Sequence, residues 1–122
     1  MLAIKIGSIP FMLLKLPPDP SLKDLQLVFE GRYWGKASWR ANSYRYDELM
    51  RYFGEERRPR DIFRADVAAY REWSKKKGRS DTTINATMQT FSSFYNYLNE
   101  LELVEKDYNP WKGMLPKRIR IR

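Results

Sequence analysis

The chain has 122 residues, enough for one domain with a modest core, and its 43% of apolar residues excludes a disordered chain. It contains no cysteine and no histidine, which excludes disulfides and removes the usual neutral-pH base and the commonest metal ligand. There is no glycine-rich phosphate loop and no nucleophile–base signature. We therefore expect no catalysis, cofactor, metal site or small-molecule substrate in this chain.

The formal net charge of +8 is unevenly distributed. Residues 36–79 carry a net +6 and residues 106–122 a net +5, whereas residues 80–105 carry −4 and no basic residue. Basic blocks on a folded domain favour a polyanionic partner, with nucleic acid first and anionic lipid second. Charge alone leaves open a surface that is merely solubilising.

The first twenty residues, MLAIKIGSIPFMLLKLPPDP, are apolar but do not read as a membrane span. Lys5, Pro10 and Lys15 interrupt them, and a spanning helix needs about 20 consecutive apolar residues. They also lack the basic start and small-residue cleavage site of a signal peptide. We expect an N-terminal arm or extended segment over residues 1–20, which is equally consistent with a strand or a docking segment.

Two helices are predicted after the proline-rich boundary at residues 17–20. The first begins at Ser21, because Asp24 three residues later approximates a capping box, and ends near Gly31. The second covers about residues 38–53. Their apolar faces consist of Leu22, Leu25, Val28, Phe29, Tyr46, Leu49, Met50 and Phe53.

Two more helices are predicted in the second half. The third covers about residues 64–77, where three final lysines suit the negative end of the helix dipole before Gly78 terminates it. The fourth begins at residue 80 or 81 and runs to about residue 99. Their apolar faces consist of Val67, Ala69, Tyr70, Trp73, Ile84, Met88, Phe91, Phe94, Tyr95 and Leu98. The pattern predicts an all-α fold, a compact bundle of four main helices.

The fourth helix has no charged residue from Thr82 to Asn99. An uncharged face of hydroxyls and amides suits close approach to DNA, because acidic side chains are repelled by phosphate. Amide side chains also pair bidentately with adenine, and a helix N-terminus favours a phosphate. We assign Arg79, Ser80, Thr82, Thr83 and Asn85 to the DNA backbone, with Ala86 and Gln89 nearer the groove.

Each of these residues also has a structural interpretation. Ser80 or Asp81 is expected to cap the helix, and Asp81 opposes phosphate binding. Thr83 is equally consistent with a hydrogen bond within its own helix or a place in the core.

The start of the second helix is the other candidate DNA surface. It brings together basic and polar side chains that suit phosphate binding, namely Lys36, Ser38, Arg40, Asn42, Ser43 and Arg45. A solvated basic face is the alternative. Three arginines in the following loop are weaker candidates because neighbouring acids would neutralise them; these are Arg57, Arg58 and Arg60.

Three segments in order carry a family resemblance: DIFRADVAAYREW at 61–73, SDTTINATMQTFSSFYNYL at 80–98 and LVEKDYNPWKGM at 103–114. Together they resemble the N-terminal core-binding domain of tyrosine recombinases of the phage-integrase type. The resemblance covers about residues 21–114 and implies a SAM-like helical DNA-binding domain, with residues 115–122 starting a basic linker. It also implies that the second and fourth helices approach the major groove.

The resemblance further implies a function in DNA integration and recombination. The domain would clamp duplex DNA at the core site, alongside other recombinase protomers. The protein, bacterial or phage-encoded, would be cytoplasmic and associated with the nucleoid. The family's catalytic residues belong to a separate C-terminal domain, so no enzyme activity is expected of this chain. The alternative is a helical protein-interaction module with an uncharged docking helix and with Tyr33, Trp34 and Trp39 as interface anchors.

Overall fold

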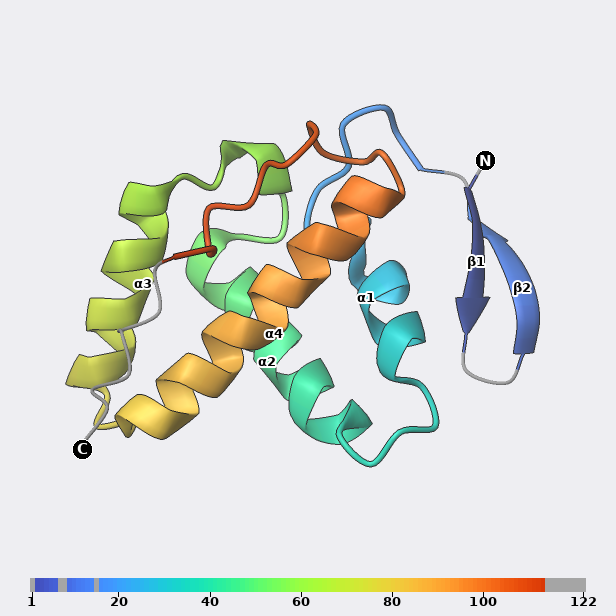
Figure 1. Ribbon diagram of the computed structural model, residues 1–122. Coiled ribbons are helices and arrows are strands. Elements are labelled where there is room, and N and C mark those ends of the chain that lie inside the picture. The colour runs from blue at the N-terminus through green and yellow to red at the C-terminus, as the bar shows by residue number, and fades with distance from the viewer. Residues whose placement is uncertain (1, 7–8, 15, 114–122) are drawn as a thin grey trace, which may run out of the picture. The chain divides into compact units, whose positions relative to one another are not determined.

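The computed structural model describes residues 2–6, 9–14 and 16–113 (Figure 1). Its α-helices are α1 (Gln26–Tyr33), α2 (Trp39–Phe53), α3 (Arg64–Lys76) and α4 (Asp81–Glu100). A short 3-10 helix, η1 (Pro59–Asp61), follows α2, and two strands, β1 (Leu2–Ile6) and β2 (Ile9–Leu14), precede α1. The four main helices of the expected all-α fold are confirmed, since all regular structure within residues 16–113 is helical.

Chain contacts divide the protein into two units, Met1–Asp61 and Ile62–Arg122, and each is described by itself. The domain boundaries predicted near residues 20 and 114 stay predictions. All four helices fall between those positions. The expected linker at residues 115–122 lies outside the described residues.

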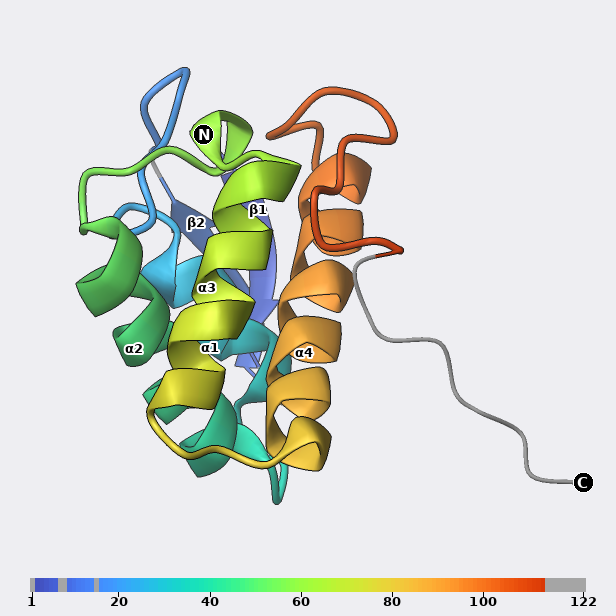
Figure 2. The same cartoon turned by 90° about the vertical axis from the view of Figure 1, so that its left-hand side faces the viewer.

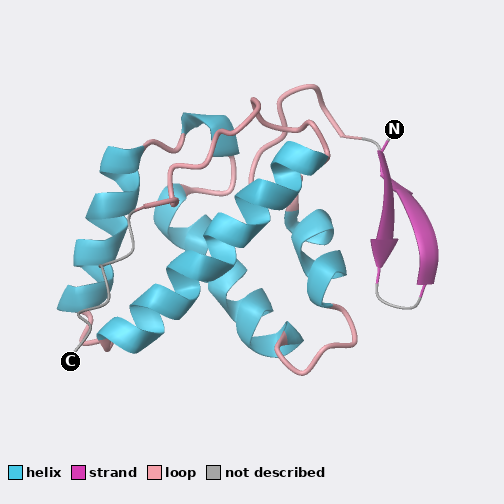
Figure 3. Ribbon diagram, in the orientation of Figure 1, coloured by secondary structure: helices cyan, strands magenta, loops and turns pink. Residues whose placement is uncertain are grey.

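The N-terminal segment of the first unit is a hairpin (Figure 3). β1 and β2 pair in antiparallel fashion, with Leu2 opposite Leu14 and Ile6 opposite Ile9, and the register shifts between Ile4 and Ile6. Of the forms that the sequence left open for this segment, the strand is the one observed. β1 also contacts α1.

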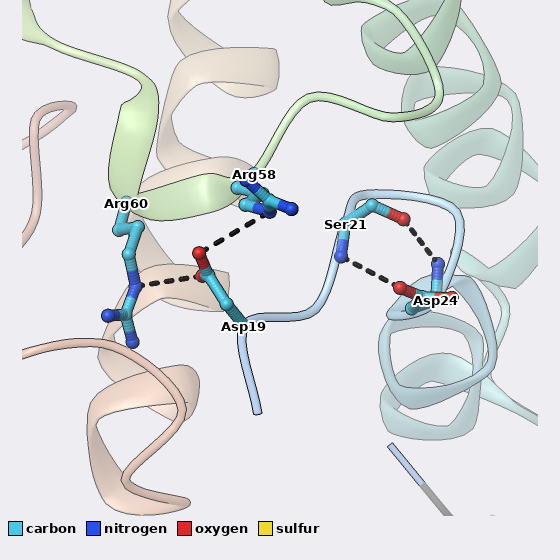
Figure 4. Close-up of polar contacts among 5 residues, drawn as sticks. All are labelled: Asp19, Ser21, Asp24, Arg58 and Arg60. Atoms are coloured by element: carbon cyan, nitrogen blue, oxygen red, sulfur yellow. Dashed lines mark hydrogen bonds and ion pairs between the residues drawn. The ribbon is translucent and has the colours of Figure 1, made fainter. Parts of the chain in front are cut away.

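A reciprocal capping box precedes α1, as Ser21 and Asp24 predicted (Figure 4). The Ser21 N–H donates to Asp24 Oδ2 at 3.0 Å, and the Asp24 N–H donates to Ser21 Oγ at 3.2 Å. The box closes a turn ahead of the helix, and regular helix starts at Gln26 and not at Ser21. The other end was also predicted too early, because α1 continues through Gly31 to Tyr33.

The core of the first unit joins α1 to α2 through aromatic packing. The Phe29 and Tyr46 rings stack with centroids 4.5 Å apart, and the Tyr46 hydroxyl donates to the Leu22 carbonyl. Gly54 ends α2 at φ 98°, a conformation that favours glycine. The buried apolar residues of this unit's helical part are Leu22, Leu25, Val28, Phe29, Tyr46, Leu49 and Met50, which matches the predicted faces except for half-buried Phe53.

The second unit consists of α3, α4 and the segment that follows them. The two helices run in opposite directions and lie side by side, joined by a short turn (Figures 1 and 2). Gly78 in that turn has φ 86°, so glycine is the residue that ends α3 without strain. The buried apolar residues of this unit are Ile62, Val67, Tyr70, Ile84, Met88, Phe91, Phe94, Tyr95, Leu98, Val104 and Trp111.

The segment after α4 folds back along that helix (Figure 2). Trp111 is fully buried. The centroid of its ring lies 5.1 Å from that of Phe91 and 5.8 Å from that of Tyr70. The Tyr108 hydroxyl donates to the Ile62 carbonyl. The core of this unit therefore extends past Asn109 and Pro110 to Trp111, whose indole packs between α3 and α4.

We expect Phe91→Ala to lower the free energy of unfolding by about 3–5 kcal/mol, because removal of a fully buried ring leaves a cavity beside Trp111. Gln89→Ala, on the exposed side of the same helix, is the control and should change stability by less than about 0.5 kcal/mol. Urea denaturation of both variants measures the difference. Equal stabilities would contradict the assignment of Phe91 to the core.

Candidate nucleic-acid interface

The N-terminus of α4 is capped by Ser80. Its Oγ accepts a hydrogen bond from the Thr83 N–H at 3.2 Å and donates to Thr83 Oγ1 at 3.0 Å. Ser80 is therefore the cap that the sequence left open between Ser80 and Asp81. Thr83 is exposed, so of its alternatives the core position is excluded and local hydrogen bonding is observed.

Three predicted site residues share the outer side of the first turns of α4. Thr82 and Gln89 are exposed and Ala86 is half-buried, and spacings of four and three residues place them on one helix face. Asn85 is half-buried, and its Oδ1 lies away from solvent without a hydrogen-bond partner. The first half of the uncharged helix thus presents a hydroxyl, a methyl group and an amide outward.

The second half of the uncharged helix contacts its own chain. Asn109 Nδ2 donates to the Ser92 carbonyl at 2.9 Å, to Ser92 Oγ at 3.1 Å and to Asn96 Oδ1 at 3.1 Å. Asn99 Nδ2 donates to the Tyr108 carbonyl at 3.0 Å. Here the uncharged polar residues hold the returning segment, a structural role that sequence analysis did not assign.

The turn between α3 and α4 places two cations against Trp73. Lys77 Nζ lies 4.5 Å and the Arg79 guanidinium carbon 5.3 Å from the centre of the Trp73 ring. Arg79 Nη1 also lies 3.4 Å from Ser74 Oγ. Arg79 is therefore half-buried and held in place next to the start of α4, and Trp73 is the residue whose role in holding it was missed.

The start of α2, in the first unit, exposes three of its predicted residues, Lys36, Ser38 and Arg40. Ser38 occupies the N-cap position at φ −83° and ψ 0°, and its side chain makes no capping hydrogen bond. This helix start therefore lacks the side-chain cap that closes the start of α4. Its outward groups are one hydroxyl and two cations.

The other three predicted residues of this helix take part in hydrogen bonds within the unit. Arg45 Nη1 donates to Asn42 Oδ1 at 2.8 Å, and Ser43 Oγ donates to Glu30 Oε1 at 3.0 Å. Asn42 is only 4% exposed, so its side chain lies beneath the surface and orients Arg45. Arg45 and Ser43 are half-buried.

Two of the weaker arginine candidates are paired with an acid that the sequence did not indicate (Figure 4). Asp19 lies 3.3 Å from Arg58 Nε and 2.9 Å from Arg60 Nε. Arg57 donates to the Asp61 carbonyl. The two ion pairs of Asp19 join the proline-rich segment to the loop after α2, which gives Arg58 and Arg60 a structural role.

Tyr33 carries the resolved pKa shift in this region. Burial raises the pKa of its phenol, and the positive charges of Arg32 and Arg45 only partly oppose that effect. The phenol thus stays neutral at physiological pH. Arg32 and Lys36 lie 5.9 Å and 6.0 Å from the centre of its ring.

The described residues contain no group of three or more metal-ligating side chains, and no described helix is long and apolar enough to cross a membrane. An open pocket of about 560 Å³ lies in the second unit. Its lining combines the start of α3 with the segment after α4 and consists of Phe63, Arg64, Ala65, Asp107, Tyr108, Asn109 and Pro110.

Comparison of the chain with family models, with curated proteins and with solved structures gave no match. The family resemblance therefore rests on the residues and their order.

We expect Asn109→Ala to lower the free energy of unfolding by roughly 1–3 kcal/mol, because it leaves the part-buried Ser92 carbonyl without a donor and the buried backbone N–H of Trp111 without its acceptor. Asn96→Ala removes one acceptor of Asn109 Nδ2 and should cost less. Thermal or urea denaturation measures both. An unchanged midpoint for Asn109→Ala would show that the returning segment is held by Trp111 alone.

Proposed function

We propose that this chain is the DNA-binding domain of a site-specific tyrosine recombinase of the phage-integrase type. In this proposal it takes the SAM-like arrangement of core-binding domains and clamps duplex DNA at the recombination core site. The observation that carries the proposal is the exposed uncharged face of Thr82, Ala86 and Gln89 at the start of α4, with Arg79 held beside it.

The chemistry of this face fits a duplex. The Gln89 amide matches the donor and acceptor pair on the major-groove edge of adenine, and the Ala86 methyl suits a thymine methyl group. The Thr82 hydroxyl and the Arg79 guanidinium donate to phosphates. The N–H groups at the helix start attract the same phosphates, because the positive end of the helix dipole lies there.

The start of α2 supplies a second set of phosphate ligands in the proposal. Lys36 and Arg40 are exposed, and Arg45 is oriented by Asn42. Each cation that neutralises a phosphate releases condensed counterions, so these residues would contribute affinity without sequence preference. Ser38 donates a neutral hydrogen bond to the same backbone.

Strand cleavage is assigned in this proposal to a separate C-terminal domain. The family's catalytic set combines a Tyr nucleophile with Arg, Lys and His, and this chain has no His. The recombinase would work with other protomers on double-stranded DNA at the nucleoid, in the cytoplasm. No cofactor or small-molecule substrate is invoked for the binding step.

We expect the chain to bind duplex DNA weakly, with a Kd of roughly 10⁻⁴ to 10⁻⁶ M at physiological salt, because few phosphates are contacted by one domain. Fluorescence anisotropy of a labelled duplex, titrated at several salt concentrations, measures it. The affinity should fall steeply as salt rises. No binding at about 50 mM salt would contradict the DNA proposal, since electrostatic contacts are strongest there.

We expect Arg40→Ala and Arg79→Ala each to weaken duplex binding and to flatten the salt dependence of log K by about 0.9 for each phosphate that is no longer neutralised. Arg51→Ala is the matched control. Arg51 is an exposed arginine on α2, eleven residues from Arg40 and thus about 16 Å along the helix. It should leave affinity and salt slope nearly unchanged apart from the general decrease in positive charge.

The melting temperature is measured on the same variants, because Arg79 also packs on Trp73 and its removal costs some stability. If Arg40→Ala and Arg79→Ala bind as Arg51→Ala does, the two helix starts do not face DNA. A helical protein-interaction module with an uncharged docking helix then becomes the better interpretation. A partner bound through aromatic anchors would show little salt dependence.

A further inference from the structure

The stretch from Gly31 to Tyr46 contains no acidic residue. It contains four cations and five aromatic residues, namely Arg32, Lys36, Arg40, Arg45, Tyr33, Trp34, Trp39, Tyr44 and Tyr46. It spans the end of α1, the connecting loop and the first half of α2. Phosphate binding accounts for the cations, but it does not account for an exposed indole among them.

That indole belongs to Trp34, the residue directly after α1. Its side chain is 47% exposed, an unusual position for the largest apolar side chain. The ring of Trp39 meets it at 83° with centroids 5.3 Å apart, an edge contact that holds the indole in one orientation. Gly35 follows with φ 79°, a conformation that favours glycine, and apart from its chain neighbours no heavy atom lies within 4 Å of the position a Cβ would take.

Several positively charged residues lie near Trp34 in the sequence. Lys36 and Arg40 are exposed, and Lys36 and Arg32 lie beside Tyr33, the neighbour of Trp34. A ligand that covers the indole must therefore tolerate a strongly positive surrounding. A flat aromatic group attached to a negatively charged group would cover the indole and also pair with the neighbouring cations.

We propose that Trp34 is a stacking platform for an unpaired nucleobase of single-stranded DNA, with the flanking phosphates bound by Lys36 and Arg40. Base–aromatic stacking with basic residues along the backbone is a common mode of binding single strands. The inference rests on the proposed function in that DNA is the ligand. It goes further because a paired base in a closed duplex offers no free face to Trp34.

A protein partner fits these observations less well. An apolar protein surface over Trp34 would remove the neighbouring cations from water without an acidic group to pair with them. An acidic protein would pair with the cations, and polyglutamate is a test ligand of that chemistry.

The test compares Trp34→Ala, Trp34→Phe and Phe63→Ala in binding a labelled 15-residue thymidine oligonucleotide. We expect Trp34→Ala to weaken binding by about 5- to 150-fold, because stacking contributes roughly 1–3 kcal/mol per base. Its salt slope should stay unchanged since no charge is removed. Trp34→Phe should keep most of the affinity, and Phe63→Ala, which removes a 57% exposed aromatic from the other unit, should keep all of it.

Two further ligands show whether a decrease in affinity is specific to single-stranded DNA or extends to any polyanion. A fully paired duplex and polyglutamate, at the same ionic strength, should bind Trp34→Ala nearly as well as the wild-type chain. Circular dichroism confirms that each variant is folded, and Trp34→Leu, which keeps an apolar side chain but removes the ring, replaces Trp34→Ala if that variant does not fold.

Several outcomes would overturn the inference. Unchanged oligonucleotide binding by folded Trp34→Ala, or an equal decrease in Phe63→Ala, excludes stacking on Trp34, yet leaves duplex binding through Arg40 and Arg79 intact. Equal weakening toward the duplex makes Trp34 a general contact, and equal weakening toward polyglutamate identifies an acidic protein as the partner. If the wild-type chain binds neither form of DNA, the proposed function fails as well.

Discussion

In the second unit, the segment after α4 is held against that helix by the side chain of Asn109, which uses both ends of its amide. The Nδ2 group donates to Ser92 and Asn96 on α4, and Oδ1 accepts a hydrogen bond from the backbone N–H of Trp111. These bonds direct the chain so that the Trp111 indole enters the core between Tyr70 and Phe91. A charged side chain in place of Ser92 or Asn96 would lose these hydrogen bonds to Asn109, which gives these two positions a reason to be polar and uncharged.

The two halves of α4 have different surroundings. The second half is covered by the protein's own chain, whereas the first half presents Thr82, Ala86 and Gln89 outward beside a capped and positively charged turn. The proposed role in DNA recombination therefore rests on a surface of only two to three turns, together with the start of α2. In the first unit, the proposed stacking on Trp34 would add an aromatic contact to the cations at the start of α2.

Local patterns predicted the helices well because each has a strong apolar period and a clear end. Gly54, Gly78 and Ser80 take the roles their residue types indicate, and the predicted faces of α1 and α4 are buried, whereas the Ser21–Asp24 box forms ahead of α1 and does not mark its first residue. Contacts between distant residues were not predictable in the same way. The pairing of Asp19 with Arg58 and Arg60, and of Asn109 with α4, joins residues far apart in the chain, so no periodic signal marks it. The same limit explains why Asn42 was grouped with exposed phosphate ligands although it lies beneath Arg45.

The contrast between two tryptophans has a spectroscopic consequence. Trp111 is fully buried among aromatic rings, and Trp34 exposes 47% of its side chain to water. An indole in an apolar core emits at shorter wavelength than one in water, and of these two rings that of Trp34 is the one open to a soluble quencher such as iodide. Trp39 and Trp73 are half-buried and also contribute to the fluorescence of the chain. With those two replaced by phenylalanine, the emission of Trp111 would follow the unfolding of the second unit, and that of Trp34 would follow occupancy of the loop between α1 and α2.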